Sequence, residues 1–146
     1  MPSCDEVTVA TGAITDGLSY DADLSASQTA DEAYPQRVCV YTVDDATQVG
    51  VTIAEIPFQQ TELDQYATLP GAIADERLDE HSGVLQTFVA GDGDDGHLDS
   101  PLYLFDTRYS ITIQGVSSEG STVESLPALT VVAAADAAFA VRELLG

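Results

Sequence analysis

The chain has 146 residues, of which 45% are hydrophobic, and it carries 25 Asp and Glu against four Arg and no Lys, giving a formal net charge of −21. Length and hydrophobic content indicate one folded domain over residues 1–146, because a disordered chain of this charge would contain far fewer apolar residues. The lack of Lys excludes Schiff bases, Ser–Lys dyads and P-loops, and the negative charge argues against nucleic acid and anionic lipid as partners.

The N-terminal part of the sequence predicts a helix followed by a β-hairpin. Apolar residues recur at helical spacing between Cys4 and Leu18. Residues 19–36 are polar without a sustained period and predict a long loop that has room for a short strand. Residues 37–43 and 49–56 are rich in β-branched side chains and flank a turn at Asp44 and Asp45, so they predict two paired strands.

The rest of the chain predicts a middle helix, three more strands and a closing helix. Thr61 and Asp64 resemble a capping box, and Pro70 interrupts the pattern that follows, which indicates a broken helix or two short ones over residues 61–80. The later elements are three strands and one amphipathic helix, at residues 83–90, 102–107, 109–116 and 129–144.

This order of elements predicts an α+β fold. We expect an antiparallel sheet of about five strands with the N-terminal, middle and C-terminal helices packed on one face. No segment approaches the ~20 apolar residues of a membrane span, so we expect the domain itself not to insert into a membrane. The residues from Met1 to Cys4 lack the features of a signal peptide, and a signal peptide or a lipid anchor upstream of Met1 stays open.

Cys4 and Cys39 are the two cysteines of the chain, and they lack the Cys-x-x-Cys spacing of zinc ribbons and redox dithiols. We favour a disulfide between them, which would stabilise the fold by about 3 to 4 kcal/mol in the chain-entropy model. Two separate buried thiols are the alternative, and lipid attachment at Cys4 is another.

The segment from Gly91 to Asp99 combines glycines with a cluster of acids. Its glycines match G-x-G-x-x-G, but a predicted strand follows instead of a helix, and the acids would repel a pyrophosphate, so we interpret it as a connecting loop. Its carboxylates suit a hard cation, although the spacing is not that of an EF-hand, and a solvated acidic turn is the competing interpretation. The candidate calcium ligands are Asp92, Asp94, Asp95 and Asp99.

The sequence offers few groups for catalysis. His81 and His97 are the only conventional bases near neutral pH, and neither has a metal-ligand partner at helical spacing. Ser117 follows Gly115 in a pattern that lacks the final glycine of a nucleophile elbow. We therefore expect a protein that is not an enzyme and has no cofactor other than the candidate calcium.

Four features give a resemblance to a known group. Cys4 opens the first helix, Cys39–Tyr41 lies in the first strand, Gly91–Asp94 forms a Gly-x-Gly-Asp turn, and the closing helix is rich in Ala. In this the chain resembles the ectodomains of small actinobacterial cell-envelope lipoproteins, a group largely of unknown function. The resemblance implies an exported, surface-anchored, non-catalytic domain whose signal peptide has been removed.

The leading functional hypothesis is an extracytoplasmic module of the cell envelope, or a secreted one, that binds an unknown protein or small ligand or has a structural role. A second hypothesis is an acidic regulator that binds a basic protein. A third is a cytoplasmic domain of a halophile, in which the charge serves solubility at high salt.

Overall fold

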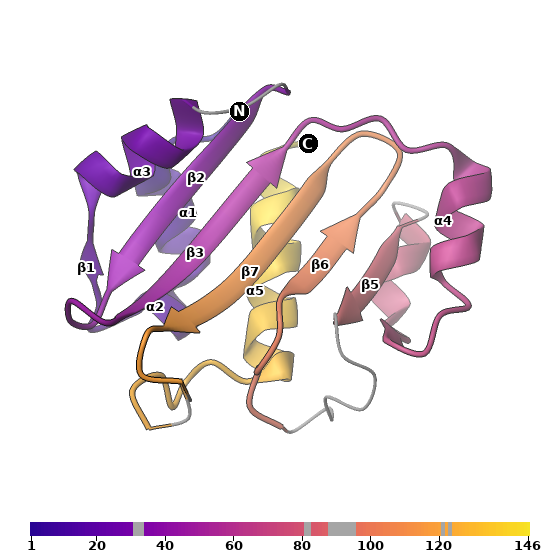
Figure 1. Ribbon diagram of the computed structural model, residues 1–146. Helices are drawn as coiled ribbons and strands as arrows, with labels where there is room; N and C mark the ends of the chain where they lie inside the picture. The colour runs from indigo at the N-terminus through magenta and orange to yellow at the C-terminus, as the bar shows by residue number, and fades with distance from the viewer. Residues whose placement is uncertain (31–33, 81–82, 88–95, 121, 123) are drawn as a thin grey trace.

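The computed structural model describes residues 1–30, 34–80, 83–87, 96–120, 122 and 124–146. Within them the chain forms a mixed α+β fold around a fully antiparallel sheet of seven strands in the order β1-β2-β3-β7-β6-β5-β4 (Figure 1). The strands are β1 (Ser19–Tyr20), β2 (Gln36–Thr42), β3 (Thr47–Ala54), β4 (Ala72–Ile73), β5 (Val84–Thr87), β6 (Leu102–Phe105) and β7 (Ser110–Ser117).

The sheet has seven strands within the described residues, whereas the sequence predicted about five. The two additional strands, β1 and β4, are the edge strands and have two residues each, and β1 is a short strand of the kind for which residues 19–36 had room. A strand this short shows no alternation that a sequence pattern can detect, because the period of a strand is itself two residues. The expected hairpin of β2 and β3 is present, as are the strands β5, β6 and β7 at the predicted places.

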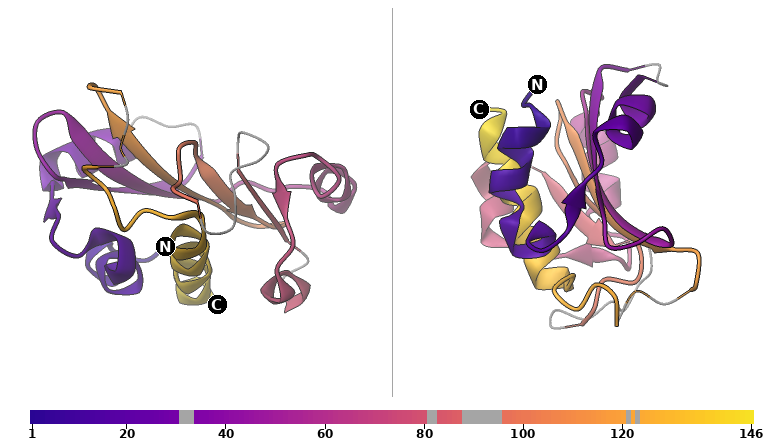
Figure 2. Two further views of the ribbon diagram at one scale, coloured as in Figure 1. Left: turned by 90° about the horizontal axis from the view of Figure 1, so that it is seen from below. Right: turned by 90° about the vertical axis from the view of Figure 1, so that its left-hand side faces the viewer.

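The helices lie on both sides of the sheet, so the expectation that all of them pack on one face is wrong. Figure 2 shows α1 and α5 together on one side and α3 on the other. On the second side α4 also packs, through a small cluster in which its Leu63 meets Val84 and Phe105. The helices are α1 (Cys4–Ala10), α2 (Gly12–Thr15), α3 (Ala22–Ala30), α4 (Gln60–Tyr66), the 3₁₀ helix η1 (Glu76–Glu80) and α5 (Val131–Leu144).

The main core lies between the sheet and α5. Alternate residues of the central strand β3, namely Val49, Val51 and Ile53, are fully buried there. The helix meets them with small residues such as Ala134 and Ala138, which let its backbone approach the sheet closely. Burying side chains of this kind contributes roughly 1.5 to 3 kcal/mol for each Val or Ile, which makes this layer the main source of stability.

Polar side chains set where the helices begin. Ser3 and Glu6 form a capping box at α1, because the Ser3 Oγ accepts from the Glu6 N–H and the Glu6 carboxylate accepts from the Ser3 N–H. In α5 the Thr130 Oγ1 accepts from the Ala133 N–H at 3.1 Å. The capping box expected at Thr61 is displaced: α4 begins at Gln60, and the N–H of the preceding Gln59 donates to Glu62.

Candidate functional site

The predicted disulfide between Cys4 and Cys39 is present and joins α1 to β2. The two Cα atoms lie 5.6 Å apart, and Cys39 is fully buried in the main core. A second contact supports the same junction, since the hydroxyls of Thr8 and Tyr41 lie 2.8 Å apart. The bond is typical of proteins that fold in an oxidising compartment outside the cytoplasm.

The candidate calcium ligands are not brought together by the described part of the chain. Asp92, Asp94 and Asp95 lie outside the described residues, and Asp99 is an exposed residue between Leu98 and β6. Across the described ranges, no group of three or more His, Cys, Asp or Glu side chains is placed to hold a metal ion. The calcium site therefore stays a prediction.

The histidines and the serine that the sequence singled out have structural partners where they are described. His97 Nε2 lies 2.9 Å from the Thr122 hydroxyl, and the His97 backbone pairs with Thr130, so this residue fastens the segment that leads into α5. Ser117 Oγ accepts from the Thr47 hydroxyl and from the Glu119 N–H at a turn. His81 lies outside the described residues.

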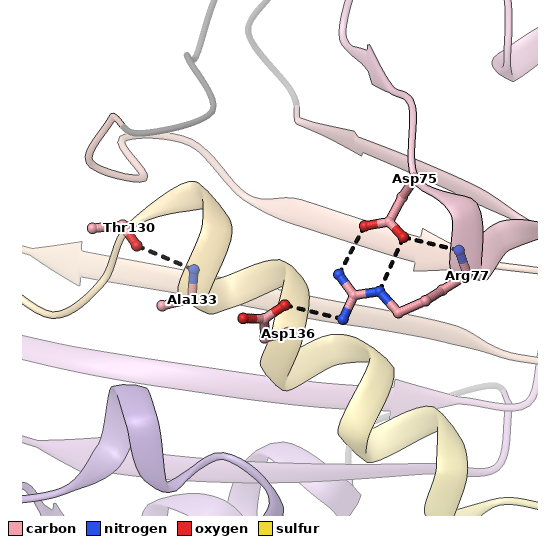
Figure 3. A network of polar contacts seen from close by, with 5 residues as sticks. All are labelled: Asp75, Arg77, Thr130, Ala133 and Asp136. Carbon is pink, nitrogen blue, oxygen red and sulfur yellow. Dashed lines mark hydrogen bonds and ion pairs between the residues drawn. The ribbon is translucent and has the colours of Figure 1, made fainter.

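Arg77 is the centre of a polar network between η1 and α5 (Figure 3). Its Nε and Nη2 donate to the two carboxylate oxygens of Asp75, and its Nη1 donates to Asp136 at 3.0 Å. The guanidinium also lies over the ring of Phe139, 4.1 Å from its centroid. The hydrogen bonds from Arg77 hold the pKa of Asp75 below its ordinary value, although burial acts in the opposite direction.

A cavity of about 170 Å³ adjoins this network. Apart from the ion-paired residues, its walls are mostly apolar, and they are formed by Ile73, Ala74, Leu85, Val131, Val132 and Ala135. The Arg77 guanidinium is already flanked by two of the protein's own carboxylates, those of Asp75 and Asp136, whose negative charge disfavours an anionic ligand there. We therefore interpret Arg77 as a clamp that holds η1 against α5.

A different surface is left uncovered on the other side of the sheet. In Figure 1 the viewer looks onto this side, where the central strands β3 and β7 have no helix in front of them, and α3 and α4 lie at its two ends. The side chains that point to this side are uncharged, and we call them the open face: Gln48, Gly50, Thr52, Thr112, Gln114 and Val116. Together with Val38 they line a shallow hollow of about 110 Å³.

Gly50 lies in this hollow, opposite Gln114 in the pairing of β3 with β7. A Cβ atom added there would meet no atom within 4 Å. Gly115 differs, because a Cβ at that position would lie 2.6 Å from Leu129 in the core. At position 115 the core side chain of Leu129 would therefore have to shift to admit a Cβ atom, whereas at position 50 the fold leaves room for one.

Exposed acids stand on the elements that border the open face. The turn after β2 and the turn after β7 lie side by side, because the Ser118 N–H donates to the Ala46 carbonyl, and both turns carry acids. Other acids stand at the end of β3, on α3 and on α4. We call this set the rim acids: Asp23, Asp44, Asp45, Glu55, Glu62 and Glu119.

Comparisons with protein families, with curated proteins and with solved structures found no match to this chain. No helix in the described ranges is long and apolar enough to cross a membrane. The geometry of the chain itself is therefore the basis for any functional argument. The sequence reasoning missed the open face, although the glycine within the alternating segment Val49–Ile53 was a visible signal of it.

Proposed function

We propose that this protein is an extracytoplasmic, non-catalytic binding domain that contacts another protein through its open face. The observation that carries the proposal is the uncovered, uncharged surface of the central strands in a chain whose net charge is −21. Protein interfaces commonly have a centre that is depleted of charged residues and a polar rim. The open face and the rim acids have this arrangement.

Two further features support the proposal. The Cys4–Cys39 disulfide is consistent with an oxidising environment outside the cytoplasm, which agrees with an exported protein of the cell envelope or a secreted one. His97 and Ser117 do not pair with each other: His97 Nε2 lies beside the hydroxyl of Thr122, which is only 6% exposed, and the Ser117 hydroxyl accepts from Thr47.

A photo-crosslinking experiment in cells that produce the protein tests the proposal. A photoreactive amino acid is placed at Gln114, which is exposed on the open face, and in a control protein at Val132, which is exposed on α5 on the opposite side of the sheet. We expect a protein adduct of defined mass from position 114 and none from position 132. Adducts from position 132 alone, or from neither position, would contradict the proposal.

The acidic regulator remains a second candidate because of the net charge of −21. Strong affinity for a defined basic protein that survives physiological salt would favour it, whereas loss of all binding at that ionic strength would mark the charge as nonspecific. The cytoplasmic halophile domain is a third, and it requires reduced cysteines in the cell and folding only at molar salt. Mass spectrometry of the protein before and after reduction separates it from the exported domain.

A further inference from the structure

Gly50 has no explanation inside the fold. It lies within a central strand between Val40 and Gln114 on the neighbouring strands, where an added Cβ atom would meet no atom within 4 Å. Its backbone conformation is one that other residues adopt, since the glycines with positive φ in the described residues are Gly17, Gly120 and Gly146. A glycine inside a strand weakens it, and such a glycine often marks a place where a ligand or another chain comes close.

The charges around Gly50 restrict what that ligand can be. Its neighbours Gln48, Thr52 and Gln114 offer amide and hydroxyl groups, and no charged side chain stands among the residues of the open face. If the centre bound a cation directly, we would expect a carboxylate there, in a chain that has 25 of them. The rim acids, by contrast, attract positive charge at the border of the face.

From this arrangement we infer that the open face docks a segment of a protein with an uncharged centre and Lys or Arg on both sides of it. One side chain of the uncharged centre enters the hollow above Gly50, and the basic residues meet the rim acids. This inference rests on the proposed binding function and adds to it the chemistry of the partner and the place of closest approach.

The variant Gly50→Thr gives the inference a sharp test. Threonine already occurs on the open face at positions 52 and 112, it adds no charge, and its Cβ meets no atom within 4 Å, so the new side chain occupies part of the hollow. We expect the melting temperature to rise, because threonine favours strands and restricts the unfolded chain. We expect binding through the open face to weaken by at least about tenfold, because the hollow is closed.

The matched control is Gly12→Ala in α2, which packs beside α5 on the opposite side of the sheet. A Cβ atom at position 12 makes an ordinary contact with Asp16 at 3.6 Å. This variant also replaces a glycine, but it leaves the open face unchanged, so we expect it to bind like the original protein.

In the experiment, displayed random peptides are selected for binding to the oxidised full chain at physiological salt. The affinity of each selected peptide is then measured for the original protein and for both variants. Peptides with an uncharged centre and flanking Lys or Arg that lose affinity for Gly50→Thr and keep it for Gly12→Ala would support the inference. Selected peptides that lose affinity for Gly50→Thr but lack basic residues would overturn the partner chemistry and leave the binding face standing. Peptides insensitive to Gly50→Thr would overturn the docking site, and a selection that yields no binder would count against both proposals.

Discussion

Asp106 and Arg142 form a buried ion pair at the junction of β6 with α5. The Arg142 Nε donates to Asp106 Oδ2 at 2.7 Å, and both side chains are only 7% exposed. The other carboxylate oxygen accepts from the backbone N–H groups of Arg108 and Tyr109, which shapes the turn into β7. One carboxylate thus fixes both the end of the closing helix and a turn of the sheet.

We predict that Asp106→Ala lowers the free energy of unfolding by about 3 to 5 kcal/mol, because it leaves the buried Arg142 without its partner. Urea denaturation followed by circular dichroism measures this. The control is Arg108→Gln, which changes an exposed side chain at the same turn and is expected to have an effect within about 0.5 kcal/mol. Equal effects of the two substitutions would show that the buried ion pair contributes no more to the free energy of unfolding than the exposed Arg108 side chain does.

The same carboxylate gives a prediction for acid unfolding. Burial by itself raises the pKa of Asp106, but hydrogen bonds from Arg142, Arg108 and Tyr109 outweigh it, so the pKa lies below its ordinary value. A lowered folded-state pKa contributes stability that is present above the unfolded value of about 3.9 and is lost as the pH falls through the folded value.

We therefore expect the free energy of unfolding to drop below pH ~4 and to drop less in Asp106→Asn, which has no proton to take up at this position. Denaturation series at several pH values measure both slopes. Parallel slopes for the two proteins would show that Asp106 does not contribute to acid unfolding.

At the scale of elements, α3 supplies hydrogen-bond acceptors to the edge of β2, as a neighbouring strand would. Its Ser25 hydroxyl accepts from the Val40 N–H, and its Thr29 hydroxyl accepts from the Val38 N–H, each at 2.9 Å. These two N–H groups point away from β3, at the edge of the sheet where only the two-residue β1 pairs. The helix thereby protects an edge that would otherwise be open to pairing with another chain.

We predict that the double substitution Ser25→Ala and Thr29→Val destabilises the protein by about 1 to 3 kcal/mol for each N–H group left unpaired, and promotes aggregation. Hydrogen exchange at the Val38 and Val40 amides and light scattering measure the two effects. Ser27→Ala on the exposed side of the same helix is the control. Unchanged exchange at both amides would mean that the hydroxyls are not what protects them.

The role of α3 also shows where the sequence was a poor guide. Residues 19–36 predicted a loop, because the helix has hardly any amphipathic pattern and its main contacts to the sheet are hydroxyls bonded to backbone. The strands β3 and β7 were predictable because their alternation reflects one face buried in the main core, and β2 was predictable because it is a run of β-branched and aromatic residues buried on both faces. The open face was not, because a pattern of alternation does not say whether the second face is covered by another element.

For the whole molecule the dominant property is charge. Among the four Arg, Arg77 and Arg142 pair with the protein's own carboxylates, while most acids of the described residues are exposed. Repulsion among these acids opposes compactness, and it is strongest where acids crowd. One such place is the pair of adjacent turns that carry Asp44, Asp45 and Glu119.

We predict that sodium chloride raises the melting temperature because it screens this repulsion. Most of the rise is expected between low salt and physiological ionic strength, since the Debye length falls to about 8 Å over that range. Neutralising the two turns with Asp44→Asn, Asp45→Asn and Glu119→Gln is expected to weaken the dependence on salt. Because Asp44 also accepts from the Ala46 and Thr47 N–H groups, Asp45→Asn with Glu119→Gln alone serves as the control for lost turn contacts. A melting temperature that does not change with salt would contradict the prediction.

The disulfide has a mechanical consequence. A tension applied at Met1 passes from Cys4 directly to Cys39 in β2, so the chain between them, which includes α1, β1 and α3, carries no load. The pull reaches the sheet through β2, whose whole length is paired with β3, so that ladder must shear or unzip before the sheet opens. In a domain tethered by its N-terminus, the bond moves the point of mechanical attachment from the first helix to the sheet.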